Sequence, residues 1–213
     1  TFLKRFFGGI LTIVGVSGGT YYYARDIEPS MLQLTQEYIY SDKIKAPFNQ
    51  FKIVQFTDTH IGFHYSLKQL ESLVQKINQQ KPDMIVFTGD LVDEPQAYSF
   101  HQQLSDILRK LKAKYGKFWV YGNHDHGGYG TDIILDVMRN ADFQLMKNEN
   151  AIINIQNAQI ALAGMDDAIL GDPDLELAFQ AIDPEIFTIL LAHEPDFADN
   201  TMSYPVDVQL SGH

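Results

Sequence analysis

From Phe51 onward, short apolar segments alternate with segments of helical periodicity, and polar residues follow five of the apolar segments. This alternation limits the possible folds more than any other feature, because right-handed crossovers bring the carboxyl ends of parallel strands to one edge of a sheet. Between residues 143 and 163, three apolar segments are joined by turn residues without a helix. We therefore predict an α/β (α+β) fold, a four-layer αββα sandwich of two mixed sheets with the helices outside.

The predicted elements follow from hydrophobic periodicity and from turn residues. Ser66 stands at the expected N-cap position of the first helix. The predicted strands are Phe51–Phe56, Met84–Thr88, Lys117–Tyr121, Phe143–Met146, Ala151–Ile155, Gln159–Ala163, Phe187–Ala192 and Val206–Leu210. The predicted helices are Ser66–Gln80, Gln96–Lys114, Thr131–Asn140 and Leu175–Ala181.

The composition limits the possible binding partners and metal ligands of this chain. The chain has 213 residues, enough for one domain with a substantial core, and a formal net charge of −11, which argues against binding to a nucleic-acid backbone. An acidic chain repels phosphate unless bound cations reverse the local field. Cysteine is absent from the sequence, so disulfides, thiolate zinc sites and iron–sulfur clusters are excluded. A metal must therefore be held by Asp, His or Asn.

The start of the chain has a different character. A basic beginning precedes an uncharged, mildly apolar run from Phe6 to Ala24, which predicts an export signal or a membrane anchor over residues 1–25. Residues 1–4, Thr-Phe-Leu-Lys, also resemble the tail of the twin-arginine export motif. Residues 26–50 are predicted to form a connector and an edge strand, and residues 51–213 the main domain. The expected location is the outer face of a bacterial cytoplasmic membrane, or the cell wall.

The first two polar segments are Asp58-Thr59-His60 and Gly89-Asp90, each after a predicted strand. In an extended segment, residues two apart point the same way, so Asp58 and His60 are expected to share one cation. The Asp90 carboxylate can bridge two cations through its separate oxygens, and Gly89 lets the backbone approach closely. Each segment alone also fits an ordinary turn, so the inference depends on their combination.

The third segment, Gly122-Asn123-His124-Asp125, is the most specific of the five. Asn123 offers a neutral amide oxygen to a second metal, and the adjacent His124 is left free for acid chemistry. The last two segments, His193 and Gly212-His213, also follow predicted strands but mean little alone. All five segments fall at the sheet edge where ligands collect in such folds. Their convergence indicates one site, because unrelated polar residues would scatter.

Taken in this order, the five segments resemble the calcineurin-like metallophosphoesterases, whose pattern is Asp-x-His, Gly-Asp, Gly-Asn-His-Asp/Glu, His and Gly-His-x-His. The resemblance covers about Phe51 to His213 and favours an exported or membrane-associated bacterial branch. It implies two divalent metal ions, Mn, Fe, Zn or similar, and a metal-bridging hydroxide that attacks phosphorus. The implied metal ligands are Asp58, His60, Asp90, Asn123, His193 and His213.

Within that set, the resemblance assigns Asp58 and His60 to the first metal, Asp90 to both, and Asn123, His193 and His213 to the second. His124 would protonate the leaving oxygen or steady the phosphoryl group.

Further residues near these segments are candidates for substrate contact. His64, His126 and Tyr129 lie in loops after two of the segments, although a solvated histidine is the simpler interpretation of His126. Asp166 and Asp167 are expected to line the pocket, with a turn as an equal alternative.

The implied function is hydrolysis of a phosphoric ester by a monomeric phosphodiesterase or pyrophosphatase near a membrane or cell wall. The implied partner is a small-molecule or lipid-linked phosphoester. Two alternatives stay open: a catalytically impaired binding protein, and a hydrolase of lipid-linked sugar nucleotides of the UDP-diacylglucosamine type.

The last residues of the sequence affect the expected set of metal ligands. In the family pattern, a last histidine stands two residues after His213, beyond the final residue of this sequence. We therefore expect the 51–213 domain to be incomplete at its carboxyl end. We also expect the first metal to have one ligand fewer and to bind more weakly.

Overall fold

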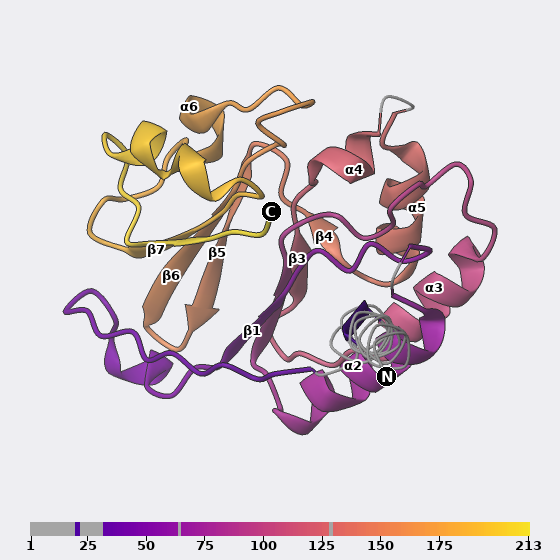
Figure 1. The fold of residues 1–213 in the computed structure, drawn as a ribbon. Coiled ribbons are helices and arrows are strands. Elements are labelled where there is room, and N and C mark those ends of the chain that lie inside the picture. The colour runs from indigo at the N-terminus through magenta and orange to yellow at the C-terminus, as the bar shows by residue number, and fades with distance from the viewer. Residues whose placement is uncertain (1–19, 22–31, 64, 128–129) are drawn as a thin grey trace, which may run out of the picture. The chain divides into compact units, whose positions relative to one another are not determined.

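The structure is a computed structural model that describes residues 20–21, 32–63, 65–127 and 130–213 (Figure 1). The chain divides into two compact units, Thr1–Glu37 and Tyr38–His213, and both sheets belong to the second. Apart from residues 20 and 21, the predicted signal or anchor over residues 1–25 lies outside the described residues. In the described parts of the chain, no helix is long and apolar enough to cross a membrane.

Two four-stranded sheets form the centre of the second unit. The first has the order β1-β2-β3-β4 and the second the order β5-β6-β7-β8. The strands are β1 (Ile53–Phe56), β2 (Met84–Phe87), β3 (Lys117–Trp119), β4 (Gln144–Leu145), β5 (Glu149–Ile155), β6 (Ala158–Gly164), β7 (Phe187–Leu191) and β8 (Val208–Leu210). The second sheet is mixed as predicted, because β5 and β6 are antiparallel and the other pairs parallel. In the first sheet the four described strands are all parallel, so the prediction of a mixed sheet was wrong there.

Helices cover the outer faces of the two sheets. Figure 1 shows α2, α3 and α5 beside the first sheet and α6 beside the second. The helices are α2 (Leu67–Gln79), α3 (His101–Leu108), α4 (Asn123–His126), α5 (Asp132–Asn140) and α6 (Leu175–Ala178), with 3-10 turns η3 (Ala46–Phe48) and η4 (Pro195–Thr201). The arrangement is the predicted four-layer sandwich.

The main core lies between the two sheets. Alternate residues of facing strands, such as Met84 and Val86 of β2 and Ile160 and Leu162 of β6, are buried in one apolar cluster. Their alternation follows from the two-residue period of a strand. Strands β2 and β7 are buried along their whole length, which explains their continuous apolar sequences.

The helix α2 begins as its sequence predicts. The Ser66 hydroxyl accepts a hydrogen bond from the Gln69 amide, and the Gln69 side chain accepts one from the Ser66 amide. This reciprocal pair satisfies amide groups that the first helical turn leaves free. The apolar face, with Leu70, Leu73 and Ile77, then packs into the core.

The helix α3 is shorter than the predicted Gln96–Lys114. Residues 95–97 form a turn before it. After Leu108 the chain turns to meet Asn78 of α2, whose side chain donates to the Lys110 carbonyl and accepts from the Lys112 amide, both at 2.9 Å. These bonds from a neighbouring helix replace the helical bonds that periodicity alone predicted. Likewise, α6 ends at Ala178 rather than Ala181.

The predicted edge strand in residues 26–50 was also wrong for the part that is described. Residues 32–50 contain turns and η3 but no strand. Pro47 lies inside η3 and has no amide hydrogen to donate to a sheet.

Candidate metal centre

The loops after β1 and β2 hold three predicted ligands in unusual backbone conformations. Asp58, His60 and Asp90 have φ angles of 50°, 37° and 62°, in the left-handed region that is costly for residues with a side chain. The segment around Asp58 and His60 is therefore not extended, as the sequence argument assumed. Backbone bonds hold it instead, from the Asp58 amide to the Gly89 carbonyl at 3.0 Å and from the His60 amide to the Asp90 carbonyl at 3.1 Å.

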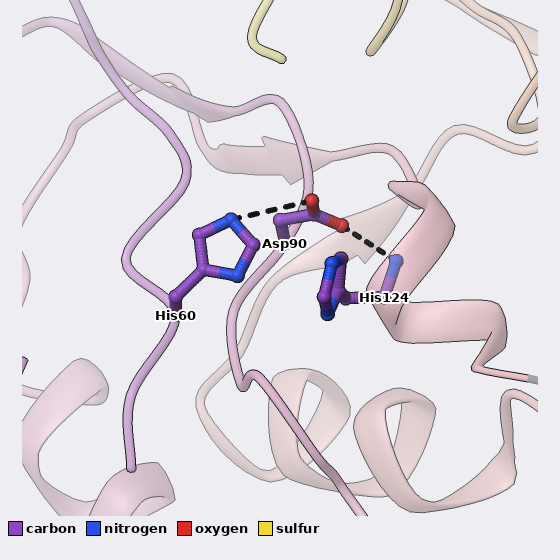
Figure 2. A group of neighbouring side chains, drawn as sticks. All are labelled: His60, Asp90 and His124. Carbon is purple, nitrogen blue, oxygen red and sulfur yellow. Dashed lines mark hydrogen bonds and ion pairs between the residues drawn. The ribbon is translucent and has the colours of Figure 1, made fainter. Parts of the chain in front are cut away.

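The carboxylate of Asp90 lies at the centre of the site. Its Oδ2 is 3.5 Å from Nε2 of His60 and 3.3 Å from Nε2 of His193, and its Oδ1 accepts a 2.8 Å bond from the backbone amide of His124. Figure 2 shows His60, Asp90 and His124 converging from the loops after β1 and β2 and from α4. Asp90 is 1% exposed, so its charge is little screened by water.

His193 follows β7 and reaches the site from the second sheet. Its Nδ1 lies 2.6 Å from the Thr88 carbonyl oxygen. Because a carbonyl can only accept, Nδ1 carries a proton and Nε2 faces Asp90. This arrangement, in which one ring nitrogen is fixed by an acceptor, is typical of metal-binding histidines.

Asp90 and His193 shift each other's pKa. Burial acts to lower the pKa of His193, but the bond and charge of Asp90 and the Thr88 carbonyl raise it to about 9. Burial likewise acts to raise the pKa of Asp90, yet His193 and the His124 amide hold it below its usual value. Without a cation the two residues form an ion pair. A metal at Nε2 would replace the His193 proton, so its binding would release a proton.

Gly212 and His213 lie against Asp58 and His193 after β8 of the second sheet. The His213 amide lies 3.2 Å and 3.0 Å from the two Asp58 carboxylate oxygens, and the His213 ring packs edge-on against His193 at 5.2 Å between centroids. A Cβ on Gly212 would collide with Thr57 and Asp58. Glycine is thus required there by the close approach of two loops.

Two groups of ligand atoms meet at Asp90. His60, Asp90 and His124 form one group and Asp58, Asp90 and His193 the other, with the ligand atoms of each group within 4.8 Å of one another. Asp90 is common to both groups, and Asp58 lies in the same group as His193. Which of these residues hold which metal stays a prediction.

The donor set fits a divalent cation. Among the described residues, Oδ1 of Asn123 is buried without a hydrogen-bond partner, which is costly unless something else satisfies it. Nε2 of His193 is also buried, and it faces the Asp90 carboxylate at 3.3 Å. Imidazole, carboxylate and amide oxygen suit Mn, Fe or Zn.

Asp93 was missed by the sequence argument. Its Oδ1 lies 3.2 Å from Nδ1 of His60 and 3.6 Å from Nδ1 of His124, and its backbone carbonyl accepts from that same His124 nitrogen at 2.9 Å. One residue thus orients two histidines. Its position three residues after Asp90 was the available signal.

The Asp125 carboxylate binds backbone amides around the site. It is fully buried, and its carboxylate accepts bonds from the amides of Gly122, Asp90 and Leu91 at 2.9–3.1 Å. Burial raises its pKa to about 6, against the effect of the amide bonds. The three amides belong to two loops, so Asp125 locks the loop after β2 to the start of α4.

The predicted substrate contacts fall in different places. Asp166 is buried and binds His126 Nε2 and Lys147 Nζ, both at 2.9 Å, and the amides of Asp167 and Asp172. His126 is thereby tied to the loop after β6 rather than to solvent. Asp167 is also buried, and its Oδ2 accepts from the Leu170 amide. The candidates His64 and Tyr129 lie outside the described residues.

The profile of the calcineurin-like phosphoesterase family matches residues 51–213. The chain belongs to this family. Its members hydrolyse phosphoric esters and use divalent metal ions, and the predicted family and four-layer fold are thereby confirmed.

Individual relatives agree with this assignment. The chain is 44% identical to the uncharacterised metallophosphoesterase YkuE of Bacillus subtilis over 213 residues, which cover all of this chain and 74% of that protein. The UDP-2,3-diacylglucosamine pyrophosphatase LpxG of Chlamydia trachomatis is 26% identical over 251 residues, covering 96% of this chain and 75% of that protein. The solved structure of TT1561 of Thermus thermophilus shares the fold, with a TM-score of 0.52 at 16% identity, covering 75% of this chain and 80% of that one.

Proposed function

We propose that this protein is a two-metal phosphodiesterase or pyrophosphatase. The observation that carries the proposal is the Asp90 carboxylate, which faces His60 and His193 from one oxygen and belongs to both groups of ligand atoms. A carboxylate shared in this way is suited to bridge two cations. Divalent ions bound there would supply charge neutralisation and activation of water for phosphoryl transfer.

The chain's own residues divide the remaining work. Asp58, His60, Asn123, His193 and His213 would hold the ions with Asp90, and Asp93 and the Thr88 carbonyl would fix the orientation of the histidine rings. The Asp125 carboxylate would keep the two loops at the right distance.

His124 is the proposed acid for the leaving group. Its Nδ1 donates to the Asp93 carbonyl, so Nε2 is the nitrogen that can exchange a proton with a substrate. Its side chain is 38% exposed, which leaves the ring accessible to a ligand entering the site. A positioned imidazole can contribute about 10²–10⁴-fold to such a step.

A lipid-linked substrate is the more specific candidate. Large apolar side chains are exposed on the loops that carry or adjoin the site: Phe63 follows His60, Phe100 follows Asp93, and Ile169 and Leu170 follow Asp167. Exposed apolar side chains on these loops are suited to contact with a lipid or another apolar ligand. The likeness to LpxG supports a pyrophosphate-linked lipid, and a position at the outer face of a membrane is part of the same proposal.

The decisive experiment is turnover by the Mn²⁺-loaded protein on three substrates: a chromogenic phosphodiester, a phosphomonoester and UDP-2,3-diacylglucosamine. We expect hydrolysis of the diester and of the pyrophosphate bond, and little of the monoester. Metal binding at two equivalents without turnover of any of the three would favour the impaired binding protein. Preferential monoester hydrolysis would contradict the proposed substrate class.

A further inference from the structure

A second, cationic pocket lies at the opposite edge of the first sheet from the metal centre. Its volume is about 690 Å³. Lys81 and Pro82 precede β2 and Gly116 precedes β3, whereas the candidate ligands follow these strands. The charged residues that line the pocket are Lys81, Arg109, Lys112, Lys114, Lys117 and Asp142.

The charge of this pocket is opposite to that of the whole chain. Five of the 16 Lys and Arg residues line it, while the formal net charge of the protein is −11. Asp142 is the one carboxylate among its described lining residues. A concave surface with such a charge attracts anions and raises their local concentration.

Bonds to the carbonyl groups at helix ends account for only some of the basic residues in this pocket. Cations are often found near the carboxyl end of a helix, where they bind free carbonyls. Arg109 does so with the Asn140 carbonyl at 2.7 Å, and Lys117 with the Ala141 carbonyl at 2.5 Å. In the described part of the chain, the ammonium groups of Lys81 and Lys112 have neither a hydrogen bond nor an ion pair. Their charges are therefore available to a bound anion.

Lys117 forms a partly desolvated floor to the pocket. The residue is 9% exposed, and its ammonium group lies 5.1 Å from the centre of the Phe143 ring. Burial lowers its pKa, and the nearby charge of Arg109 acts in the same direction against Asp142. A bound anion would compensate for this unfavourable environment, since an opposite charge stabilises a buried cation.

The wall of the pocket is held in place before any ligand binds. The Asn78 side chain joins the end of α2 to the segment after α3 through the Lys110 carbonyl and the Lys112 amide. The backbone from which Lys112 projects is therefore fixed, which reduces the entropy cost of binding.

We propose that this pocket binds a phosphate group, carried by a small phosphorylated molecule or by an anionic phospholipid. Lysine binds phosphate as a point charge, and several lysines around one cavity suit a multiply charged oxyanion. This site does not depend on the metal centre or on hydrolysis.

The test compares two variants with the same change in net charge. Lys81→Glu/Lys112→Glu alters the pocket, and Lys45→Glu/Lys68→Glu alters exposed lysines elsewhere. Binding of inorganic phosphate is measured by titration calorimetry on the metal-loaded protein and on Asp90→Asn, because phosphate also resembles a product of the metal centre. Binding to vesicles of phosphatidylcholine, with and without phosphatidylglycerol, is measured by co-sedimentation.

We expect the pocket variant to bind phosphate at least about tenfold more weakly, one order of magnitude or 1.4 kcal/mol. Asp90→Asn and the control variant should retain this binding. Weaker phosphate binding with unchanged vesicle binding identifies a soluble phosphorylated ligand, and weaker binding to phosphatidylglycerol vesicles identifies a headgroup. Equal losses in both charge variants, or no binding of either probe to the unaltered protein, would overturn the proposal.

Discussion

At the carboxyl edge of the first sheet, Asp90 and Asp125 are buried and bonded to amides and imidazoles from several loops. At the amino edge, Lys81 and Lys112 extend from the surface without a partner in the described chain. The carboxyl edge is acidic, and its side chains are hydrogen-bonded between loops; we call it the interlocked edge. The amino edge is basic, and its two lysines are exposed. The two proposals thus give one sheet two ways to bind a phosphate group: through cations that carboxylates hold, or directly through lysines. The residues of the interlocked edge should tolerate substitution far less well.

The largest effect is expected for Asp166→Asn, in the loop after β6, which His126 connects to α4. The Asp166 carboxylate is buried and accepts bonds from His126, Lys147 and two backbone amides. Hydrogen bonds to a charged group contribute about 1.5–3 kcal/mol each, so losing the charge should cost more than about 3 kcal/mol. Burial acts to raise the pKa of Asp166, but its bonds with His126, Lys147 and the Asp172 amide hold it below its usual value. The stabilisation is therefore complete above about pH 5 and declines as the pH falls. Urea unfolding at neutral and acidic pH measures it.

The matched control for that substitution is Asp136→Asn. Asp136 pairs with Arg139, but the two side chains are 60% and 69% exposed, so the loss should stay within about 1 kcal/mol. Equal losses for the two variants would mean that the loop after β6 is not interlocked with the rest of the edge.

The next effect concerns catalysis. Asp90→Asn should lower kcat/KM by more than about 100-fold, because both groups of ligand atoms include Asp90. Substitution of a residue that only orients a metal ligand costs about 10–100-fold. His126→Ala should cost less than about tenfold, since His126 contacts Asp166 rather than the ligand set. Steady-state kinetics at saturating Mn²⁺ separates the two, and similar losses would contradict the shared role of Asp90.

A smaller loss is expected for Asp93→Asn. The residue orients His60 and His124 without belonging to either group of ligand atoms, so metal affinity should fall by about 10–100-fold. The residual activity should recover as Mn²⁺ is raised. If activity stays low at saturating metal, Asp93 acts on the substrate or on the His124 proton instead.

The smallest effect is expected at the amino edge. Lys81→Glu/Lys112→Glu should leave kcat on a chromogenic phosphodiester within about twofold and stability within about 0.5 kcal/mol, because both side chains are exposed. Kinetics and urea unfolding on the same preparation check this. A large change in either would show that the two edges are coupled.

The sequence by itself predicted the alternating strands and helices, the start of α2 at Ser66 and the five polar segments that converge. These depend on local periodicity and capping, which neighbouring residues determine. The metal-ligand roles of those segments remain predictions that the substitutions above test.

Tertiary structure alone decided the rest. The end of α3 depends on Asn78, and the place of His126 depends on Asp166, 40 residues away in sequence. The left-handed backbone at Asp58 and Asp90 is held by bonds between loops. The group of Asp58, Asp90 and His193 combines residues from both sheets. Such contacts join residues far apart along the chain, so they form only when the packed sheets hold the loops together. The order of residue types along the chain does not specify which distant residues will lie close together in the fold.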